Sequence, residues 1–264
     1  MKLPNFLLPK FRCELIRLGQ KNDGGYAIPK KSLENSKFVF GFGLSDDWSF
    51  ERDFKKLSGA KVICYDLSVN GKYWLIRFCK DLINMFLLRE GILGSFKRFT
   101  TYFGYKFFFD GKDKIHERKI IAPTEQRIHG VNQSDITDLN QILSGKDNFN
   151  FFLKVDIEKH EYRILEQIIK YQERLTGLVI EFHDCDFHFK KIKSFIDRFK
   201  LQLVHIHVNN YGDINASGFA TVIELTFSPQ SYNTIREKND NKFPVIRLDQ
   251  PNDKNRKDEP IIFE

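Results

Sequence analysis

Three apolar segments in the second half of the chain are followed directly by carboxylates, imidazoles and amides. The segments cover residues 149–155, 177–182 and 201–208. If they are neighbouring strands of an open sheet, the polar groups at their ends should surround one crevice, where such sheets bind ligands. Asp156, His183 and His207 are then candidates for a general base that takes a proton from an acceptor group. The groups expected to orient that acceptor are Glu181 and Asn209.

The same side chains could instead hold a divalent metal ion. Mixed carboxylate and imidazole ligands suit such ions, so Asp156, His183 and His207 form a candidate metal site. Simple acid–base chemistry without an ion is the competing hypothesis. A third reading is purely structural, with the polar cluster tying three loops together. The sequence leaves all three open.

A second candidate site follows the apolar segment 37–43. Two glycines there allow a tight turn and a close approach of the backbone to a ligand. Asp46 stands at the third glycine position of the dinucleotide pattern GxGxxG, and its charge would repel a phosphate but attract a sulfonium or an ammonium group. Asp66, about 20 residues past the glycines, can accept the hydroxyls of a ribose. The predicted cofactor-binding residues are therefore Gly41, Gly43, Ser45, Asp46 and Asp66.

Apolar strands and helical segments alternate along the chain. Segments 37–43, 60–65, 149–155 and 177–182 are nearly continuous apolar runs, as in parallel strands that are covered on both faces. Helical spacing is seen in 49–57, 161–171 and 187–199. The last two strands, 201–208 and 221–227, are joined by a short Asn/Gly-rich loop that suits an antiparallel hairpin. The pattern predicts a Rossmann-like class I methyltransferase fold, an α/β fold with a mostly parallel seven-stranded sheet that ends in that hairpin.

Five segments, in order along the chain, resemble the FkbM-type S-adenosylmethionine-dependent methyltransferases. They are 17–29 (RLGQKNDGGYAIP), 41–51 (GFGLSDDWSFE), 153–165 (LKVDIEKHEYRIL), 179–183 (VIEFH) and 205–212 (HIHVNNYG). The resemblance is to a bacterial subgroup associated with O-methylation of glycans and small sugars. It implies S-adenosylmethionine as the cofactor, and it brings Asp23 and Gly24 into the predicted cofactor site, at the mouth of the crevice.

The chain departs from the family pattern at two places. The usual acid of the first strand is absent, with Phe40 and Gly41 in its place. The usual glycine of the DxEGxE motif is replaced by Lys159. The first departure bears on how the methionine end of the cofactor would be held, whereas Asp66 and Asp156 are unaffected.

A length of 264 residues predicts a single methyltransferase domain over 1–264. The block 68–118 is rich in Phe, Tyr, Lys and Arg and is expected to be a partly helical insertion or cap that helps to form the acceptor site. The polar tail 250–264 is expected to be poorly ordered. The most apolar stretch, 73–88, is interrupted by charges, so no membrane-spanning segment is expected.

Net charge and cysteine usage constrain the partners and the compartment. The net charge of +7 and the pI of about 9.1 suit an anionic partner. A small-molecule or nucleotide-linked sugar acceptor is expected, and no nucleic acid, because no nucleic-acid-binding motif is found. Four scattered cysteines without a CxxC pair favour the reducing cytoplasm. The alternatives are a nucleic-acid or other small-molecule methyltransferase, a nicotinamide-dependent oxidoreductase and a non-catalytic binding protein.

Overall fold

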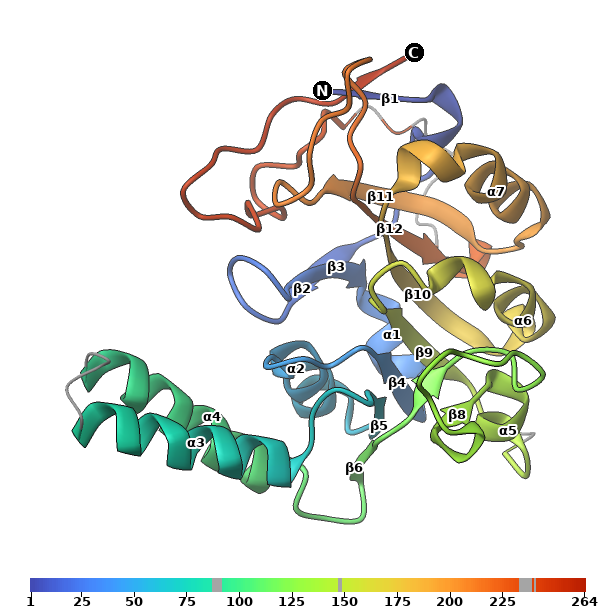
Figure 1. The fold of residues 1–264 in the computed structure, drawn as a ribbon. Coiled ribbons are helices and arrows are strands. Elements are labelled where there is room, and N and C mark those ends of the chain that lie inside the picture. Colours follow the sequence, from blue (N-terminus) through green and yellow to red (C-terminus); the bar gives the residue numbers. More distant parts are fainter. Residues whose placement is uncertain (87–91, 147–148, 233–238, 240) are drawn as a thin grey trace.

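A computed structural model describes residues 1–86, 92–146, 149–232, 239 and 241–264 (Figure 1). Its centre is a seven-stranded sheet with the order β11-β12-β10-β9-β4-β5-β6. Strand β12 runs antiparallel to both of its neighbours, whereas the other adjacent pairs are parallel. The strands are β4 (Phe38–Phe42), β5 (Lys61–Tyr65), β6 (Lys114–Glu117), β9 (Phe151–Val155), β10 (Leu175–Phe182), β11 (Gln202–Val208) and β12 (Ile223–Ser228).

This strand order is that of a Rossmann-like class I methyltransferase fold. The first strand of this sheet along the chain is β4, which lies in its middle. Strands β5 and β6 follow on one side of β4, and the chain then crosses to β9 and β10 on the other side. A dinucleotide-binding Rossmann sheet has the order 3-2-1-4-5-6. Here an additional antiparallel strand, β12, lies between the fifth and sixth parallel strands. The predicted fold class and terminal hairpin are confirmed.

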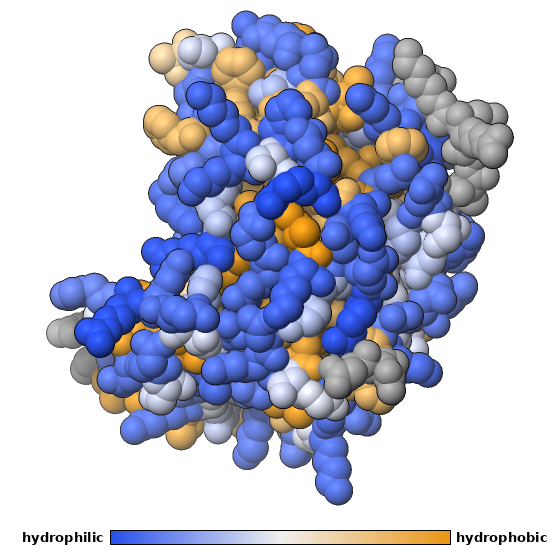
Figure 2. All heavy atoms as spheres, turned by 90° about the vertical axis from the view of Figure 1, so that its right-hand side faces the viewer, coloured by the Kyte–Doolittle hydropathy of each residue, from blue (hydrophilic) through white to orange (hydrophobic). Residues whose placement is uncertain are grey.

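Two layers cover the sheet. Helices α5 (Leu139–Leu143), α6 (Leu165–Lys170) and α7 (Cys185–Arg198) lie on one face. The outer surface of that layer is mainly hydrophilic, with apolar atoms in the gaps between polar side chains (Figure 2). The other face packs against α1 (Lys30–Asn35), α2 (Ser49–Ser58) and the antiparallel pair β2 (Leu15–Leu18) and β3 (Tyr26–Pro29).

Side chains alternate between these two layers along each strand. Phe40 and Phe42 belong to the core beneath α6 and α7, and Val39 belongs to the core beneath α2 and β3. The same alternation places Leu153 and Val155 in the first core. It therefore directs the intervening strand residues of β4 and β9 toward α2 and β3.

The block 68–118 contains a helical hairpin followed by a sheet strand. Helices α3 (Gly71–Phe86) and α4 (Ile92–Phe108) pack against each other and project from the sheet (Figure 1). Residues 87–91 lie outside the described part of the chain. The predicted insertion extends too far, because β6 forms the edge of the sheet beside β5. Only one large apolar residue, Ile115, marks this half-buried edge strand, so the apolar pattern is weak there.

The tail 250–264 is not the poorly ordered extension that its composition predicts. Strand β13 (Ile262–Phe263) pairs in parallel with β1 (Lys2–Leu3), so the two ends of the chain lie side by side (Figure 1). Tail side chains also bind polar groups of the sheet, as described below. Charged composition predicts solvation only when no buried partner of opposite charge exists, and here β11 supplies such partners.

The remaining elements are short. Strands β7 (Ile120–Ile121) and β8 (Ile136–Thr137) form a parallel pair. The predicted helix 161–171 is divided into a 3₁₀ turn, Glu161–Arg163, and α6. Further 3₁₀ turns cover Asn5–Leu7, Gln133–Asp135, Gln172–Arg174 and Gln230–Tyr232. Among the described helices, none is both long enough and apolar enough to cross a membrane.

Candidate active site

A row of polar side chains crosses the sheet on the face that packs against β3. Glu181 of β10 lies opposite Glu224 of β12, which lies opposite His207 of β11. All three are almost fully buried. Buried polar groups are costly unless they are hydrogen-bonded. The elements that cover this face must therefore supply partners, and β3 and the C-terminal tail do so.

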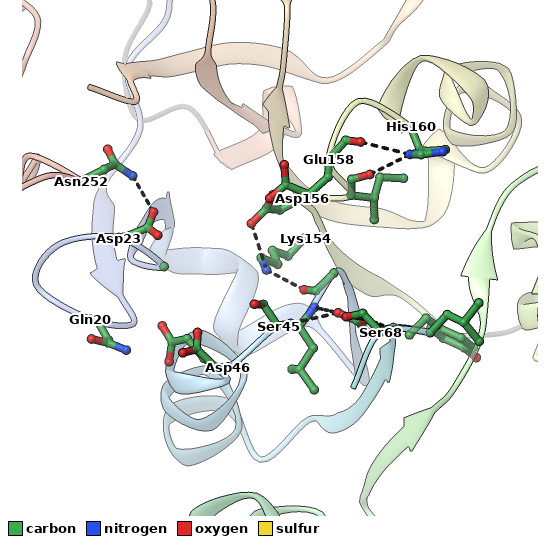
Figure 3. A pocket seen from close by; sticks show the side chains of 18 of the residues that line it. Gln20, Asp23, Ser45, Asp46, Ser68, Lys154, Asp156, Glu158, His160 and Asn252 are labelled. Atoms are coloured by element: carbon green, nitrogen blue, oxygen red, sulfur yellow. Dashed lines mark hydrogen bonds and ion pairs between the residues drawn. The ribbon is translucent and has the colours of Figure 1, made fainter. Parts of the chain in front are cut away.

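A pocket of about 1160 Å³ opens at the carboxyl ends of β4, β5 and β9 (Figure 3). This is the edge at which open parallel sheets bind ligands. Its wall carries more negative than positive side chains, although the net charge of the protein is +7. The carboxylates are Asp23, Asp46, Asp47, Asp66, Asp156 and Glu158, and the lysine and arginine side chains are Arg118, Lys119, Lys154 and Lys254.

The loop after β4 lies directly against the end of β9. Gly43 has φ +82°, and a Cβ atom at this position would lie 1.6 Å from the carbonyl oxygen of Asp156. Only glycine fits both the left-handed backbone and this close approach. The loop then continues along the pocket wall, where Ser45 and Asp46 are found. Gly43, Ser45 and Asp46 thus lie where the sequence predicts a cofactor.

Gly41 has a different role from the one predicted. It does not line the pocket, and a Cβ atom there would lie 2.5 Å from Oε1 of Glu51. Glu51 is fully buried, and neither of its oxygens has a hydrogen-bond partner among the described residues. Burial raises the pKa of Glu51 to about 7, while the charge of Lys154 acts in the opposite direction. Gly41 therefore makes room for a buried carboxylate from α2.

Lys154 connects the loop after β4 to the catalytic candidate on β9. Its Nζ donates to the carbonyl oxygen of Gly43 at 2.8 Å and lies 3.7 Å from Oδ2 of Asp156. Strand alternation directs Lys154 to the α2 face, so its ammonium group is almost fully buried. The sequence analysis did not single out Lys154, although an ionisable residue inside an apolar strand was a usable signal.

Asp66 follows β5 and lies on the pocket wall. Its Oδ2 accepts the backbone N–H groups of Leu44 and Ser45, each at 2.9 Å. Its Oδ1 accepts the N–H and the hydroxyl of Ser68 at 2.7 and 2.5 Å. Burial acts to raise the pKa of Asp66. The effect of these hydrogen bonds is larger, so the pKa of Asp66 lies below its usual value. Asp66 is thus a charged group that joins β5 to the glycine loop, and a ribose would have to displace some of these donors.

Asp156 lies on the pocket wall (Figure 3), and Tyr26 connects it to Glu181 of the buried polar row. The hydroxyl of Tyr26 donates to Oδ2 of Asp156 at 2.9 Å and lies 3.5 Å from Oε2 of Glu181. Asn209 donates to Oε1 of Glu181 at 2.9 Å. Burial raises the pKa values of Tyr26 and Glu181 well above their ordinary values, and the charge of Asp156 adds to this. Asp156 is therefore the half-buried, pocket-lining end of a chain of buried hydrogen-bonding groups.

Tyr26 is a site residue to which the sequence assigned no chemical role, although it belongs to the segment predicted to fold at the mouth of the crevice. It lies within the run 17–29 that carries part of the family resemblance, but a tyrosine in a strand is more often a packing residue. Its ring lies at right angles to that of Phe50 and beneath the ammonium group of Lys154. Strand β3 is placed over the sheet by long-range contacts, such as the hydroxyl of Thr226 donating to the carbonyl oxygen of Ala27 at 2.7 Å.

His183 is surrounded by carboxylates. Its Nδ1 lies 2.8 Å from Oε1 of Glu161, and its Nε2 lies 3.4 Å from both Oε2 of Glu158 and Oε1 of Glu181. Burial lowers the pKa of His183, but the Glu161 contact and the neighbouring negative charges outweigh it and raise the pKa above its ordinary value. His183 thus lies beside Asp156, as predicted, with Glu158 and Glu161 as additional neighbours.

A strained turn after β9 brings Glu158 to this position. Glu158 and Lys159 have φ values of +51° and +76°, in the left-handed region that favours glycine. This backbone explains why the related motif has glycine where Lys159 stands. The ammonium group of Lys159 lies 2.8 Å from Asp184, an ion pair that links the turn to the end of β10.

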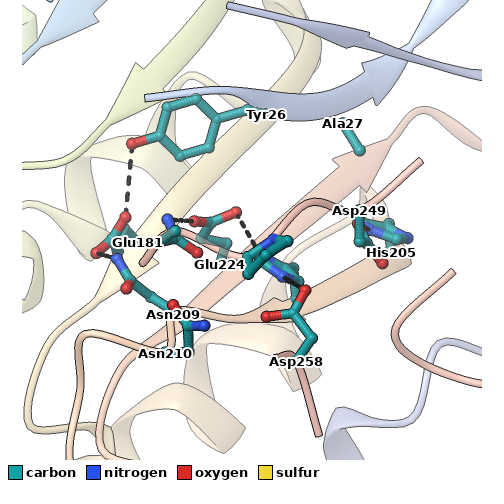
Figure 4. Close-up of polar contacts among 12 residues, drawn as sticks. Tyr26, Ala27, Glu181, His205, Asn209, Asn210, Glu224, Asp249 and Asp258 are labelled. Atoms are coloured by element: carbon teal, nitrogen blue, oxygen red, sulfur yellow. Dashed lines mark hydrogen bonds and ion pairs between the residues drawn. The ribbon is translucent and has the colours of Figure 1, made fainter. Parts of the chain in front are cut away.

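His207 does not join Asp156 and His183, and its predicted roles are corrected. Its Nδ1 lies 3.3 Å from Glu224 and its Nε2 lies 3.0 Å from Asp258 of the tail, the two carboxylates that are labelled in Figure 4. Burial lowers its pKa, but the two carboxylates outweigh it and raise the pKa of His207 to about 10. Both of its ring nitrogens are engaged by these carboxylates, and His207 does not line the pocket. His207 therefore anchors the tail.

The N-terminal loop and the tail together close one side of the pocket. Asn252 donates to Asp23 at 3.1 Å and to Glu224 at 3.0 Å, which connects the pocket wall to the buried polar row. Gly24 has φ +82°, and a Cβ atom there would lie 2.2 Å from Oδ2 of Asp47. Asp23 and Gly24 thus line the pocket mouth. In the helical hairpin, Thr100 and Thr101 of α4 reach the same pocket.

No protein-family model and no curated protein matches this chain. Among solved structures, it is similar to the crystal structure of a putative RNA methyltransferase PH1948 from Pyrococcus horikoshii, with 12% identity over 74% of each chain and a TM-score of 0.37. It is also similar to precorrin-6y C5,15-methyltransferase from Geobacter metallireducens GS-15, with 10% identity over 74% of this chain and 81% of that one and a TM-score of 0.31.

Proposed function

We propose that this protein is an S-adenosylmethionine-dependent O-methyltransferase that acts on a hydroxyl of a sugar, a sugar-nucleotide or a glycan precursor. The observation that carries the proposal is the acid-lined pocket at the carboxyl edge of a class I methyltransferase sheet. A ligand with a sulfonium and an ammonium group complements an excess of carboxylates. The resemblance to FkbM-type enzymes supports the same activity.

The residues around the pocket fit this cofactor. Gly43 brings the loop backbone to the end of β9, Asp66 is held charged at the end of β5, and Asp46 adds a further negative charge between them. These residues would hold the adenosine and methionine parts. S-Adenosylmethionine supplies a methyl group that its sulfonium already activates, so the protein mainly has to align the acceptor.

Asp156 is the base we assign to the acceptor hydroxyl. The hydroxyl oxygen would form the new bond to the methyl carbon as the sulfur–methyl bond breaks and S-adenosylhomocysteine leaves, and the hydroxyl proton would pass to the Asp156 carboxylate. Tyr26 and Lys154 hold that carboxylate in place, by the 2.9 Å hydrogen bond and the 3.7 Å ion pair. Glu181 and Asn209 act behind Asp156 by fixing the buried hydroxyl of Tyr26.

The proposed acceptor is small and rich in hydroxyl groups. Around the pocket mouth, Gln20, Asn22, Tyr211 and Asn255 provide amide and phenol groups suited to such a molecule. A nicotinamide dinucleotide would place its pyrophosphate against Asp46, which argues against an oxidoreductase.

Calorimetric titration with S-adenosylhomocysteine tests the cofactor assignment. Wild-type protein should bind it and should bind neither NAD nor NADH. Asp66→Ala should abolish binding, whereas Asp197→Ala, which removes an exposed carboxylate from α7, should leave it unchanged. Binding of NADH in place of S-adenosylhomocysteine would refute the assignment.

Labelled S-adenosylmethionine offered with sugars, sugar-nucleotides and RNA then tests the acceptor class. Label should enter a sugar-containing acceptor and depend on Asp156. If label entered RNA alone, the protein would be a methyltransferase, but the proposed sugar acceptor would be wrong.

A further inference from the structure

We propose that Asp156, Glu158 and His183 form a binding site for one divalent cation. One ligand atom from each residue lies within 4.8 Å of the other two. The set differs from the one that the sequence predicts, because Glu158 takes the place of His207. Two carboxylates and an imidazole suit a hard or borderline ion such as Mg²⁺ or Mn²⁺.

The imidazole of His183 is oriented for metal binding. In the neutral tautomer whose Nδ1–H donates to Oε1 of Glu161, across 2.8 Å, Nε2 carries no proton and is the nitrogen that can bind an ion. Nε2 points toward Glu158 and Glu181, each at 3.4 Å. In a metal-binding histidine, the second ring nitrogen usually donates its N–H in a hydrogen bond to such a carboxylate. This bond fixes both the tautomer and the orientation of the ring.

A buried carboxylate beside this cluster, that of Glu161, lacks sufficient positive charge. Glu161 is fully buried, and among the described residues its Oε2 has no hydrogen-bond partner. Two lysines lie nearby, and both already have partners: Lys154 lies against Asp156, and Lys159 is paired with Asp184. A buried carboxylate without full compensation is costly. A divalent cation bound to the neighbouring His183 would reduce that cost.

The site is accessible from the pocket. Asp156 and Glu158 both line it, and the side chain of Glu158 is 82% exposed. An ion held there would be bound by Asp156 itself, the group that we assign as the base, and it could polarise an acceptor hydroxyl as a Lewis acid. That use of the ion rests on the proposed function, whereas the binding itself does not.

A titration with Mn²⁺ tests the site without cofactor or acceptor. The electron paramagnetic resonance signal of the free ion measures how much Mn²⁺ is bound. Wild-type protein should bind one Mn²⁺ per chain. His183→Gln and Glu158→Gln should each weaken binding by about tenfold or more. Because Glu158 is exposed, its substitution leaves the fold intact and keeps the test decisive. Asp46→Asn removes a carboxylate of the same pocket outside the cluster and should leave Mn²⁺ affinity unchanged.

Three results would overturn the inference: no saturable binding to the wild type, unchanged affinity in Glu158→Gln, or an equal loss in Asp46→Asn. The last would show a diffuse negative field in place of a site. S-Adenosylhomocysteine titrated into the same samples separates the two proposals. Mn²⁺ binding without S-adenosylhomocysteine binding would leave the metal site standing and would refute the proposed function.

Discussion

Replacing Gly43 by alanine should damage both the stability of the protein and its cofactor site. Two costs arise from the structure. The left-handed backbone at φ +82° costs an alanine about 1–2 kcal/mol, of which about 0.4–1 kcal/mol is recovered through the less flexible unfolded chain. The added methyl group would also lie 1.6 Å from the Asp156 carbonyl oxygen. The clash can be relieved only if the loop after β4 or the end of β9 moves. Such overpacking typically costs a further ~1–3 kcal/mol.

Gly59 provides the matched control. It ends α2 with φ +73°, and a Cβ atom there would meet nothing within 4 Å. Gly59→Ala therefore carries the backbone cost alone, about 1 kcal/mol or less after the unfolded-state gain. The difference between the two variants isolates the contact between the glycine loop and the end of β9.

Urea unfolding and thermal denaturation measure both variants. Gly59→Ala should lower the melting temperature by about 2–4 °C, and Gly43→Ala should lower it several times more, as expected for a loss of ~2–4 kcal/mol. Folded Gly43→Ala protein should also fail to bind S-adenosylhomocysteine, whereas Gly59→Ala should bind it normally. Equal stability of the two variants would refute the close approach of the loop to β9.

Three further changes test other parts of the site. Tyr26→Phe should keep S-adenosylhomocysteine affinity and lower kcat about tenfold or more, because Asp156 loses its buried donor; an unchanged kcat would remove Tyr26 from the mechanism. Asn252→Ala should cost about 1–3 kcal/mol and expose the tail to protease, since the buried carboxylate of Glu224 and the carboxylate of Asp23 lose a donor; normal resistance to protease would contradict this. His207, with a folded pKa of about 10, stabilises the protein fully below pH 6.5, and this stabilisation falls as the pH rises through 10, by up to ~1.4 kcal/mol per unit. Unfolding of wild-type and His207→Gln protein across pH 6.5–10 should show that slope in the wild type alone; equal slopes would refute the assignment.

The sequence by itself determined the core of the sheet and the positions of Asp66 and Asp156. Strands β4, β5, β9 and β10 are buried on both faces, so their residues are nearly continuously apolar, and the first polar residue after each marks its end. Because parallel strands end at one edge, the residues at those ends could be placed together without coordinates. The antiparallel hairpin was predicted for a similarly local reason, its short Asn/Gly-rich loop.

Only the tertiary structure decided which polar groups share a site. His183 and His207 look equivalent in the sequence, yet one faces the pocket side of Asp156 and the other binds the tail. Tyr26 and Asp258 reach the sheet from opposite ends of the chain, and strand β6 is an edge strand with too few apolar residues to stand out. The alternation of residues along a strand determines which face of the sheet a side chain occupies. Its partner on that face comes from a segment distant in sequence, and local sequence patterns do not identify that segment.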